Sequence, residues 1–161
     1  MSKDIRIEPL TAEAFAPYGD IIGPSGEPTV MINRGKCGRY HDIATLDFAN
    51  GKAGISVFEG QPYDLPLILD FMERHPLGSQ AFLPLSAEPY LVIVAADADG
   101  APDRPRAFLA NSDRGVNYHR NIWHGVLTPL NEKALFAVVD RIGEGNNLQE
   151  HTFDSPYRVV E

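Results

Sequence analysis

Cysteine is nearly absent from the sequence, and long hydrophobic runs are missing. Cys37 is the only cysteine among 161 residues, which excludes an internal disulfide and favours a reducing compartment. The longest apolar run, Leu91–Ala96, is much shorter than the roughly 20 residues that a membrane-spanning helix needs. The first ten residues mix both charges and contain no apolar core of a signal peptide. We therefore expect a cytoplasmic protein with no membrane partner.

Clustered positive charge and the common catalytic signatures are also missing. The formal net charge is −8 at pH 7, and no basic tract is present, so we expect no nucleic-acid partner. A small anionic substrate stays compatible with this charge, because an arginine acts locally and distant charges are screened beyond about 8–10 Å. The sequence contains no phosphate-binding loop, dinucleotide-binding glycine pattern, nucleophilic serine elbow or CxxC pair. These absences exclude most common enzyme classes.

Short hydrophobic segments separated by turn residues are what the sequence does contain. Its 13 prolines and 14 glycines are spread along the chain, and 43% of the residues are hydrophobic, which is enough for a core. Thr11 should cap a short helix over Ala12–Pro17, which Gly19 ends. The segments with strand patterns are Ile55–Phe58, Gln80–Leu85, Tyr90–Ala95, Ala107–Ala110, Val116–Leu127 and Ala134–Arg141. One mainly β domain over residues 1–161, a sandwich or a barrel, is the expected architecture.

The segment Leu67–His75 fits two local structures. Its apolar residues could form a short helix, but we favour a strand whose alternate residues, ending with Glu73 and His75, share one face. Two titratable side chains at the end of an inward face are costly to bury without partners. They therefore mark either the wall of a site or a strand end that emerges into solvent at the turn over residues 76–78. Taken alone, the segment Glu73–Gln80 favours the second interpretation.

The segment Gly115–His124 concentrates polar and aromatic side chains. Its ten residues include two histidines, one arginine, two asparagines, one tyrosine and the only tryptophan. A turn near Arg120–Ile122 would change which of them share a face. A flat surface strand seldom carries so many hydrogen-bonding groups. We therefore interpret the segment as part of a site rather than as a core strand with satisfied polar residues, and we expect it to share one pocket with Glu73–Gln80.

A third polar segment, Ile32–Asp42, lies between the predicted helix and the first predicted strand. Gly35 and Gly38 predict a loop that presents Arg39, together with a neighbouring His41–Asp42 pair. Loops on rigid scaffolds often carry binding groups. A solvated surface loop explains the segment equally well, and the sequence leaves both interpretations open.

Two long motifs resemble one known family. ERHPLGSQAFLPL at residues 73–85 and GVNYHRNIWHGVL at residues 115–127 resemble the ureidoglycolate lyases of allantoin degradation. FAPYGDII, INRGKCGRYHD and VDRIG extend the resemblance over nearly the whole chain. The resemblance implies a cupin-like β-barrel of short antiparallel strands and a homodimer. It also implies cleavage of (S)-ureidoglycolate, a small anion, into glyoxylate and urea.

The resemblance also implies where a metal would bind. In cupins, two histidine-bearing motifs line the barrel mouth and often hold a divalent ion. Laid onto this chain, the pattern makes His75, Gln80 and His124 the candidate metal ligands. Glu73 stands where a histidine is usual, and Gln80 stands where a glutamate is usual; a neutral amide is a weaker ligand. Nickel is the metal that the resemblance suggests.

Cleavage of ureidoglycolate needs a base for the hydroxyl proton, an acid for the leaving nitrogen and a clamp on the carboxylate. The residues that we expect to exchange protons are His75, His124 and Glu73. The residues that we expect to bind the substrate are Arg120, Asn117, Tyr118, Gln80, His119 and Arg39. Arg120 is the first candidate for the residue that binds the substrate carboxylate, and Arg74 and Arg39 are the alternatives. A cupin that only binds a small ligand and a metal-dependent cupin enzyme of other specificity are the two alternatives.

Overall fold

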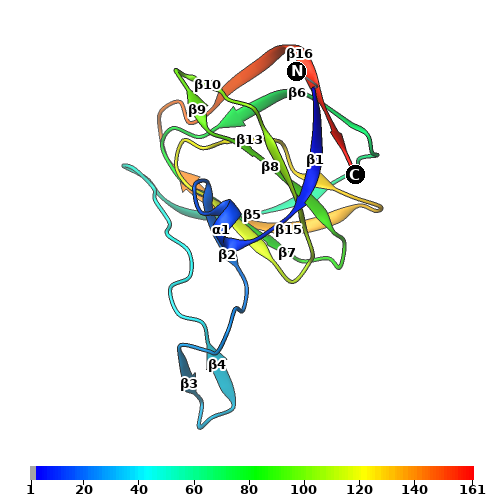
Figure 1. The fold of residues 1–161 in the computed structure, drawn as a ribbon. Helices are drawn as coiled ribbons and strands as arrows, with labels where there is room; N and C mark the ends of the chain where they lie inside the picture. Colours follow the sequence, from blue (N-terminus) through cyan, green and yellow to red (C-terminus); the bar gives the residue numbers. More distant parts are fainter. Residues whose placement is uncertain (1–2) are drawn as a thin grey trace.

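The computed structural model describes residues 3–161, which are mostly in strands (Figure 1). The elements are β1 (Asp4–Pro9), α1 (Ala12–Phe15), β2 (Gly19–Ile22), β3 (Val30–Ile32), β4 (Cys37–Arg39), β5 (Lys52–Gly60), β6 (Leu67–Arg74), β7 (Gln80–Pro84), β8 (Tyr90–Ala95), β9 (Asp97–Ala98), β10 (Ala101–Pro102), β11 (Arg106–Ala110), β12 (Gly115–Tyr118), β13 (Trp123–His124), β14 (Thr128–Pro129), β15 (Ala134–Ile142) and β16 (Gln149–Val160). No helix within this range is long and apolar enough to cross a membrane.

Six strands close into a barrel. Their order is β11-β1-β16-β6-β13-β8, and β8 pairs with β11 to complete the ring. Most neighbours are antiparallel, but β1 runs parallel to both β11 and β16. The side chains that fill the ring come from all six strands: Ile5, Leu69, Met72, Leu91, Ile93, Ala95, Ala107, Trp123 and Val159. The prediction of a mainly β barrel with a short N-terminal helix is confirmed, and the parallel pairings of β1 are an addition to it.

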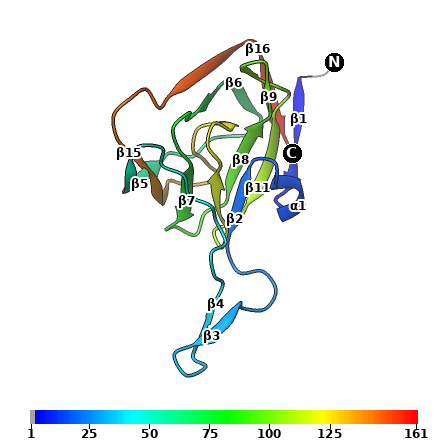
Figure 2. The same ribbon diagram turned by 90° about the vertical axis from the view of Figure 1, so that its left-hand side faces the viewer.

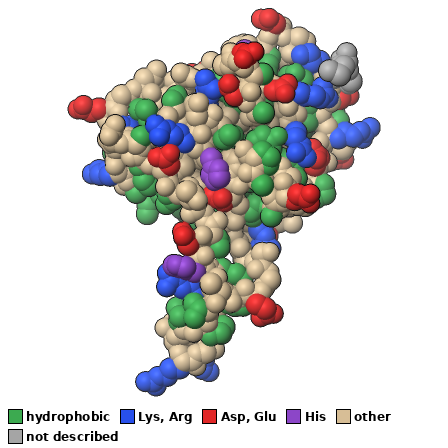
Figure 3. All heavy atoms as spheres, turned by 60° about the vertical axis from the view of Figure 1, so that its left-hand side comes forward, with side chains coloured by type: hydrophobic (Ala, Val, Ile, Leu, Met, Phe, Trp, Pro, Cys, Tyr) green, Lys and Arg blue, Asp and Glu red, His purple; other side chains and the backbone are tan. Residues whose placement is uncertain are grey.

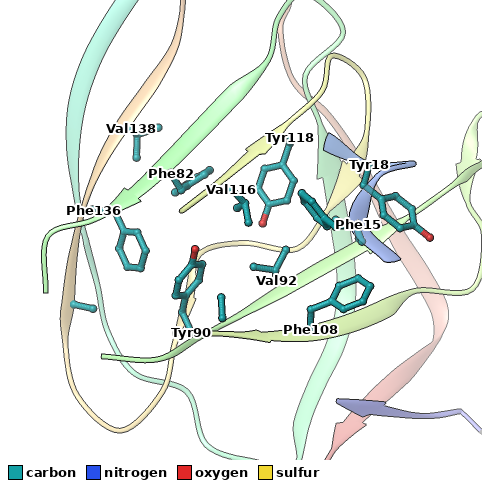
Figure 4. Close-up of a cluster of buried hydrophobic side chains, with 13 residues drawn as sticks. Phe15, Tyr18, Phe82, Tyr90, Val92, Phe108, Val116, Tyr118, Phe136 and Val138 are labelled. Carbon is teal, nitrogen blue, oxygen red and sulfur yellow. The ribbon is translucent and has the colours of Figure 1, made fainter. Parts of the chain in front are cut away.

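A second sheet, of order β2-β12-β7-β15-β5, packs against one side of this barrel. The cluster between the two layers is largely aromatic (Figure 4) and contains Phe15, Tyr18, Phe82, Tyr90, Val92, Val94, Phe108, Ala110, Val116, Tyr118, Ala134, Phe136 and Val138. Strand β8 is buried on both faces, because Leu91 and Ile93 point into the ring while Val92 and Val94 join the interlayer cluster. This position explains why its sequence is apolar without alternation.

Three local predictions can be compared with the structure. Leu67–His75 forms a strand, β6, as expected. The expected helix is shorter, since α1 ends at Phe15, but Thr11 caps it by accepting a hydrogen bond from Ala14 N at 3.2 Å. The expected continuous strand Val116–Leu127 was wrong. A turn after β12, with Asn121 at a φ of 67°, separates β12 from β13, as the alternative of a turn near Arg120–Ile122 foresaw.

A hairpin extends away from the two layers. We call residues 29–41, which contain β3 and β4, the arm. Figures 1 and 2 show it projecting from the barrel in two perpendicular views. The predicted loop is thus a short antiparallel ladder with its turn at Asn33 and Arg34, whose φ angles are 54° and 57°.

Candidate active site

The two histidine-bearing segments are in contact. The turn between β12 and β13 docks on the end of β6, where Asn121 N donates a hydrogen bond to His75 O at 2.9 Å. The neighbouring Arg120 Nε donates to Pro76 O at 2.7 Å. Within the barrel, His124 on β13 is registered with Glu73 on β6. Backbone pairing therefore brings Glu73, His75 and His124 to one place.

A cavity of about 360 Å³ opens at this place. It lies between the layers, beside the closed six-strand ring, because Trp123 points into the ring and the next residue, His124, points the other way. Strands β5 and β7 of the second sheet form its opposite wall. The lining residues are Phe58, Glu59, Gly60, Glu73, Gln80, Phe82, His124, Gly125, Val126 and Leu127.

Both imidazoles present a free lone pair. His75 Nδ1 lies 2.8 Å from Asn147 O, and His124 Nδ1 lies 2.9 Å from Gly125 O. A carbonyl oxygen only accepts hydrogen bonds, so each Nδ1 carries the proton and each Nε2 is the unprotonated nitrogen of the neutral ring. Both Nε2 atoms are buried without a hydrogen-bond partner among the described residues. The two ring centroids are 5.2 Å apart.

Glu73 completes a group of three that could hold a metal ion. Its carboxylate and one ligand atom from each histidine lie within 4.8 Å of one another. Burial raises the pKa of Glu73, an effect that nearby His75 opposes and the charge of Glu150 reinforces. Two imidazoles and a carboxylate are a donor set that divalent transition metals accept. The orphaned Nε2 atoms therefore fit a cation.

Gln80 adds an oxygen to the same cavity. Its Nε2 donates to Asp140 Oδ2 at 3.2 Å, which fixes the orientation of the amide. Its Oε1 is buried and has no partner within residues 3–161. A buried amide oxygen without a partner is costly, so this atom is available to a ligand or an ion.

His124 is held in its neutral form. Burial, and to a lesser extent the neighbouring His75, lower its pKa to about 3, against the opposing effect of the hydrogen bond to the Gly125 carbonyl. The ring of Tyr118 stacks on it at a centroid distance of 4.4 Å and an interplanar angle of 3°. A neutral imidazole near pH 7 can bind a cation or accept a proton, but it cannot supply one.

The structure places the other predicted substrate-binding residues outside this cavity. Asn117 is fully buried on β12, where its Nδ2 donates to Asp20 Oδ2 and to Thr45 O. His119 Nε2 lies 2.9 Å from Asp20 Oδ2 and faces another hollow. The ring of Tyr118 stacks on the ring of His124, and Tyr118 does not line the cavity.

The predicted arginines are also elsewhere. Arg120 holds Pro76 O and lines a separate hollow with Thr45 and Asp47. Arg74 pairs with Asp97 at 2.6 Å and stacks over Trp123. Arg39 lies on β4 of the arm. No arginine or lysine of the described chain lines the cavity, so a carboxylate clamp is missing from it.

Two groups near the site had no signal in the sequence. Asn147 orients His75 through its backbone carbonyl, and its Oδ1 also accepts from Leu77 N at 2.8 Å. Gly125 orients His124 in the same way. A backbone carbonyl belongs to every residue type, so no pattern of side chains could have identified these partners.

Fold and site together define a class. This is a mainly β protein with a closed six-strand barrel, in which an imidazole, a carboxylate and an amide line a small interlayer cavity and a second imidazole lies beside them, an arrangement suited to chemistry on a small molecule.

The comparisons with known proteins agree on one family. The family described as Ureidoglycolate lyase matches residues 2–160. A ureidoglycolate lyase of Rhodobacter capsulatus is 60% identical over 156 residues, which cover 96% of this chain and 97% of that protein. A ureidoglycolate lyase of Chelativorans sp. is 52% identical over 159 residues, which cover 98% and 96%. Ureidoglycolate lyase 2 of Rhizobium meliloti is 50% identical over 157 residues, which cover 96% of each. The chain belongs to the ureidoglycolate lyase family, so the resemblance of its motifs is confirmed.

Proposed function

We propose that this chain is a carbon–nitrogen lyase that cleaves (S)-ureidoglycolate into glyoxylate and urea in allantoin catabolism. The observation that carries the proposal is that ligand atoms of Glu73, His75 and His124 lie within 4.8 Å of one another beside the cavity, with both Nε2 atoms unpartnered among the described residues. Relatives that match nearly the whole chain are named ureidoglycolate lyases. We place the reaction in the cytoplasm, in one catalytic domain that works as a homodimer.

The reaction moves one proton and breaks one bond. Glu73 takes the proton of the substrate hydroxyl, and the oxygen then forms the carbonyl of glyoxylate. The carbon–nitrogen bond breaks with its electron pair on nitrogen, which takes the proton back from Glu73 and leaves as urea. Burial raises the pKa of this carboxyl, which makes one group suited to both steps. No covalent nucleophile is required.

The histidines fit a different task from Glu73. Their Nε2 atoms are buried without a hydrogen-bond partner among the described residues, and both His124 and Gln80 line the cavity. We propose that His75, His124 and Gln80 hold a divalent ion, with nickel as the candidate, and that Glu73 stands beside them. Such an ion supplies positive charge against the substrate carboxylate and hydroxyl. In protein free of metal, His124 is the first alternative as the base, since its Nε2 is unprotonated at neutral pH.

Product analysis tests the proposal directly. Purified protein is incubated with (S)-ureidoglycolate, and urea, glyoxylate and ammonia are each measured against spontaneous decay. We expect urea and glyoxylate in equal amounts. Ammonia as the nitrogen product would indicate an amidohydrolase and contradict the lyase assignment. Retained substrate without turnover would support a binding protein, and turnover only of other substrates would support a cupin enzyme of different specificity.

A further inference from the structure

The cavity lacks a partner for the carboxylate of its proposed substrate. Two of its lining residues, Glu59 and Glu73, are acidic, and none is lysine or arginine in the part of the chain that the structure describes. Lys133, whose Nζ lies 3.6 Å from Glu59 Oε2, is exposed and is not a lining residue. The proposed ion would supply positive charge, but fixing the orientation of a carboxylate also needs a directional donor such as a guanidinium, which the same chain does not place in this cavity. This inference rests on the proposed function.

The arm has the properties of a docking element. Val30, Met31 and Ile32 are exposed hydrophobic residues, although they form a regular strand. Figure 3 shows hydrophobic and basic side chains gathered on the projecting arm. Covering exposed apolar side chains on a projecting hairpin with another surface is favourable, because it removes apolar area from water.

The register of the arm puts an arginine on its apolar face. Val30 is opposite Arg39 and Ile32 is opposite Cys37 in the β3–β4 ladder. Cross-strand partners lie on the same face, and so do residues two apart. Val30, Ile32, Cys37 and Arg39 therefore share one face. The side chain of Arg39 makes no hydrogen bond or ion pair with any residue in the range 3–161, so it is free to bind an anion.

A complementary surface lies next to the cavity. The outer face of the β2-β12-β7-β15-β5 sheet carries Ile55, Val57 and Leu85, which are 77%, 63% and 59% exposed. Strand β5 is the edge of this sheet. Its last residues, Phe58–Gly60, are also part of the cavity wall. A chain segment that covers β5 from outside therefore reaches the rim of the cavity.

We propose that the arm of a second copy of this chain packs on the outer face of β5 and places Arg39 at the cavity as the clamp for the substrate carboxylate. Charge favours a second copy as the occupant. Residues 29–41 carry three basic residues and no acidic one, which leaves 11 basic and 22 acidic residues in the rest of the chain. A two-fold dimer pairs each arm with each sheet and completes both cavities. Arg39 thus acts in the site of the partner.

Paired variants distinguish action in the partner from action within one chain. Arg39→Ala leaves the cavity intact, and His124→Ala leaves the arm intact. We expect each homodimer to lose activity, with Arg39→Ala raising KM on the order of 100-fold. In a heterodimer purified through two different tags, one site regains both groups, so about half of the wild-type activity should return. Glu73→Ala paired with His124→Ala is the matched control and should stay inactive, because both changes lie in the cavity.

Two outcomes would overturn this assignment. An Arg39→Ala homodimer with wild-type KM shows that Arg39 is not the clamp. A heterodimer as inactive as its parents shows that Arg39 does not act on the partner.

A cross-link tests the docking without any activity. Cys37 is the only cysteine and shares the face of Arg39. A maleimide–benzophenone probe on Cys37, in a mixture of ¹⁴N- and ¹⁵N-labelled chains, should capture residues 52–60 of the other isotope. Capture only within one isotope, or a monomer in sedimentation, overturns the docking. If ureidoglycolate is not cleaved but this mixed cross-link forms, the proposed function fails while the docking stands.

Discussion

The segment Gly115–His124 contributes to two regions that contain the same kinds of polar group. The two regions differ in how many of those groups have hydrogen-bond partners. At the candidate site, His75 and His124 each keep an unpartnered Nε2 near Glu73. Beside the arm, His119 and Asp20 lie 2.9 Å apart in a network that also includes Asn117 and Thr45. Burial alone would raise the pKa of Asp20, but hydrogen bonds from Asn117, Thr45 N and His119 lower it.

The unpartnered polar atoms locate the candidate site better than cavity volume does. The hollow beside Asp20 and His119 has a volume of about 510 Å³, against about 360 Å³ for the candidate site. The Asp20 oxygen in that network already accepts three hydrogen bonds, and one buried atom there, Asn117 Oδ1, lacks a partner. The smaller cavity has two unpartnered atoms on its lining residues Gln80 and His124, and a third on the adjacent His75, close to the carboxylate of Glu73. Unsatisfied buried polar atoms point to a ligand, so we place the chemistry in the smaller cavity.

The largest effect should come from Glu73→Gln. This change keeps the shape of the side chain and removes its ability to exchange a proton, so we expect kcat to fall on the order of 10²–10⁴-fold. Circular dichroism should show an intact fold. Asp20→Asn is the matched change in the other region and should keep kcat within a few-fold. Equal losses in both variants would contradict the assignment of chemistry to the smaller cavity.

Metal removal should have the next largest effect. Dialysis against a chelator should reduce activity, and nickel should restore it. The reason is that the chelator removes the divalent ion proposed to be held by the Nε2 atoms of His75 and His124, and with it the positive charge that would act on the substrate. Bound metal per chain, measured by elemental analysis, should fall in His75→Ala and stay unchanged in His119→Ala. Full activity in protein shown to be metal-free would remove the ion from the mechanism and return His124 to the role of base.

The sequence predicted some strands of the fold and missed others. Period-two patterns in β6, β7 and β15 and the unbroken apolar run of β8 follow directly from burial on one or two faces, and these strands were predicted. Strand β16 and the parallel strand β1 were not, because their partners are far away in the sequence and their own patterns are weak. β16 is mostly polar and is held by pairing with β6 and β1.

Within the site, residue type and position carried different amounts of information. His75, His124 and Glu73 were recognisable because titratable groups on an inward face need a reason to be there. Arg120 was chosen as the clamp by proximity in the sequence, but the turn at Asn121 directs it to Pro76 O instead. The direction of a side chain in a turn depends on backbone angles that a strand pattern does not specify.

Loss of the Asp20 network should reduce stability rather than activity. Asp20→Asn weakens hydrogen bonds to a buried amide and an imidazole, so we expect a loss of about 1–3 kcal/mol in urea denaturation at pH 7. The pKa of Asp20 is lowered in the folded state. Its contribution is therefore present above the unfolded pKa of about 3.8 and is lost as pH falls through the lower folded pKa. The difference between wild type and Asp20→Asn should thus shrink in acid; a difference independent of pH would exclude the carboxylate as its source.

The smallest effect should come from Arg120→Ala. Its guanidinium is partly exposed, holds Pro76 O at 2.7 Å and lies 3.5 Å from Asp47, so it joins the two site segments from outside the cavity. We expect a change of a few-fold in kcat, with KM for ureidoglycolate nearly unchanged, because the ends of β6 and β13 remain paired through Asn121 N and His75 O. Arg120→Lys is the matched control for charge. A large rise in KM that the lysine reverses would make Arg120 the carboxylate clamp after all, and would mean that the turn rearranges when substrate binds.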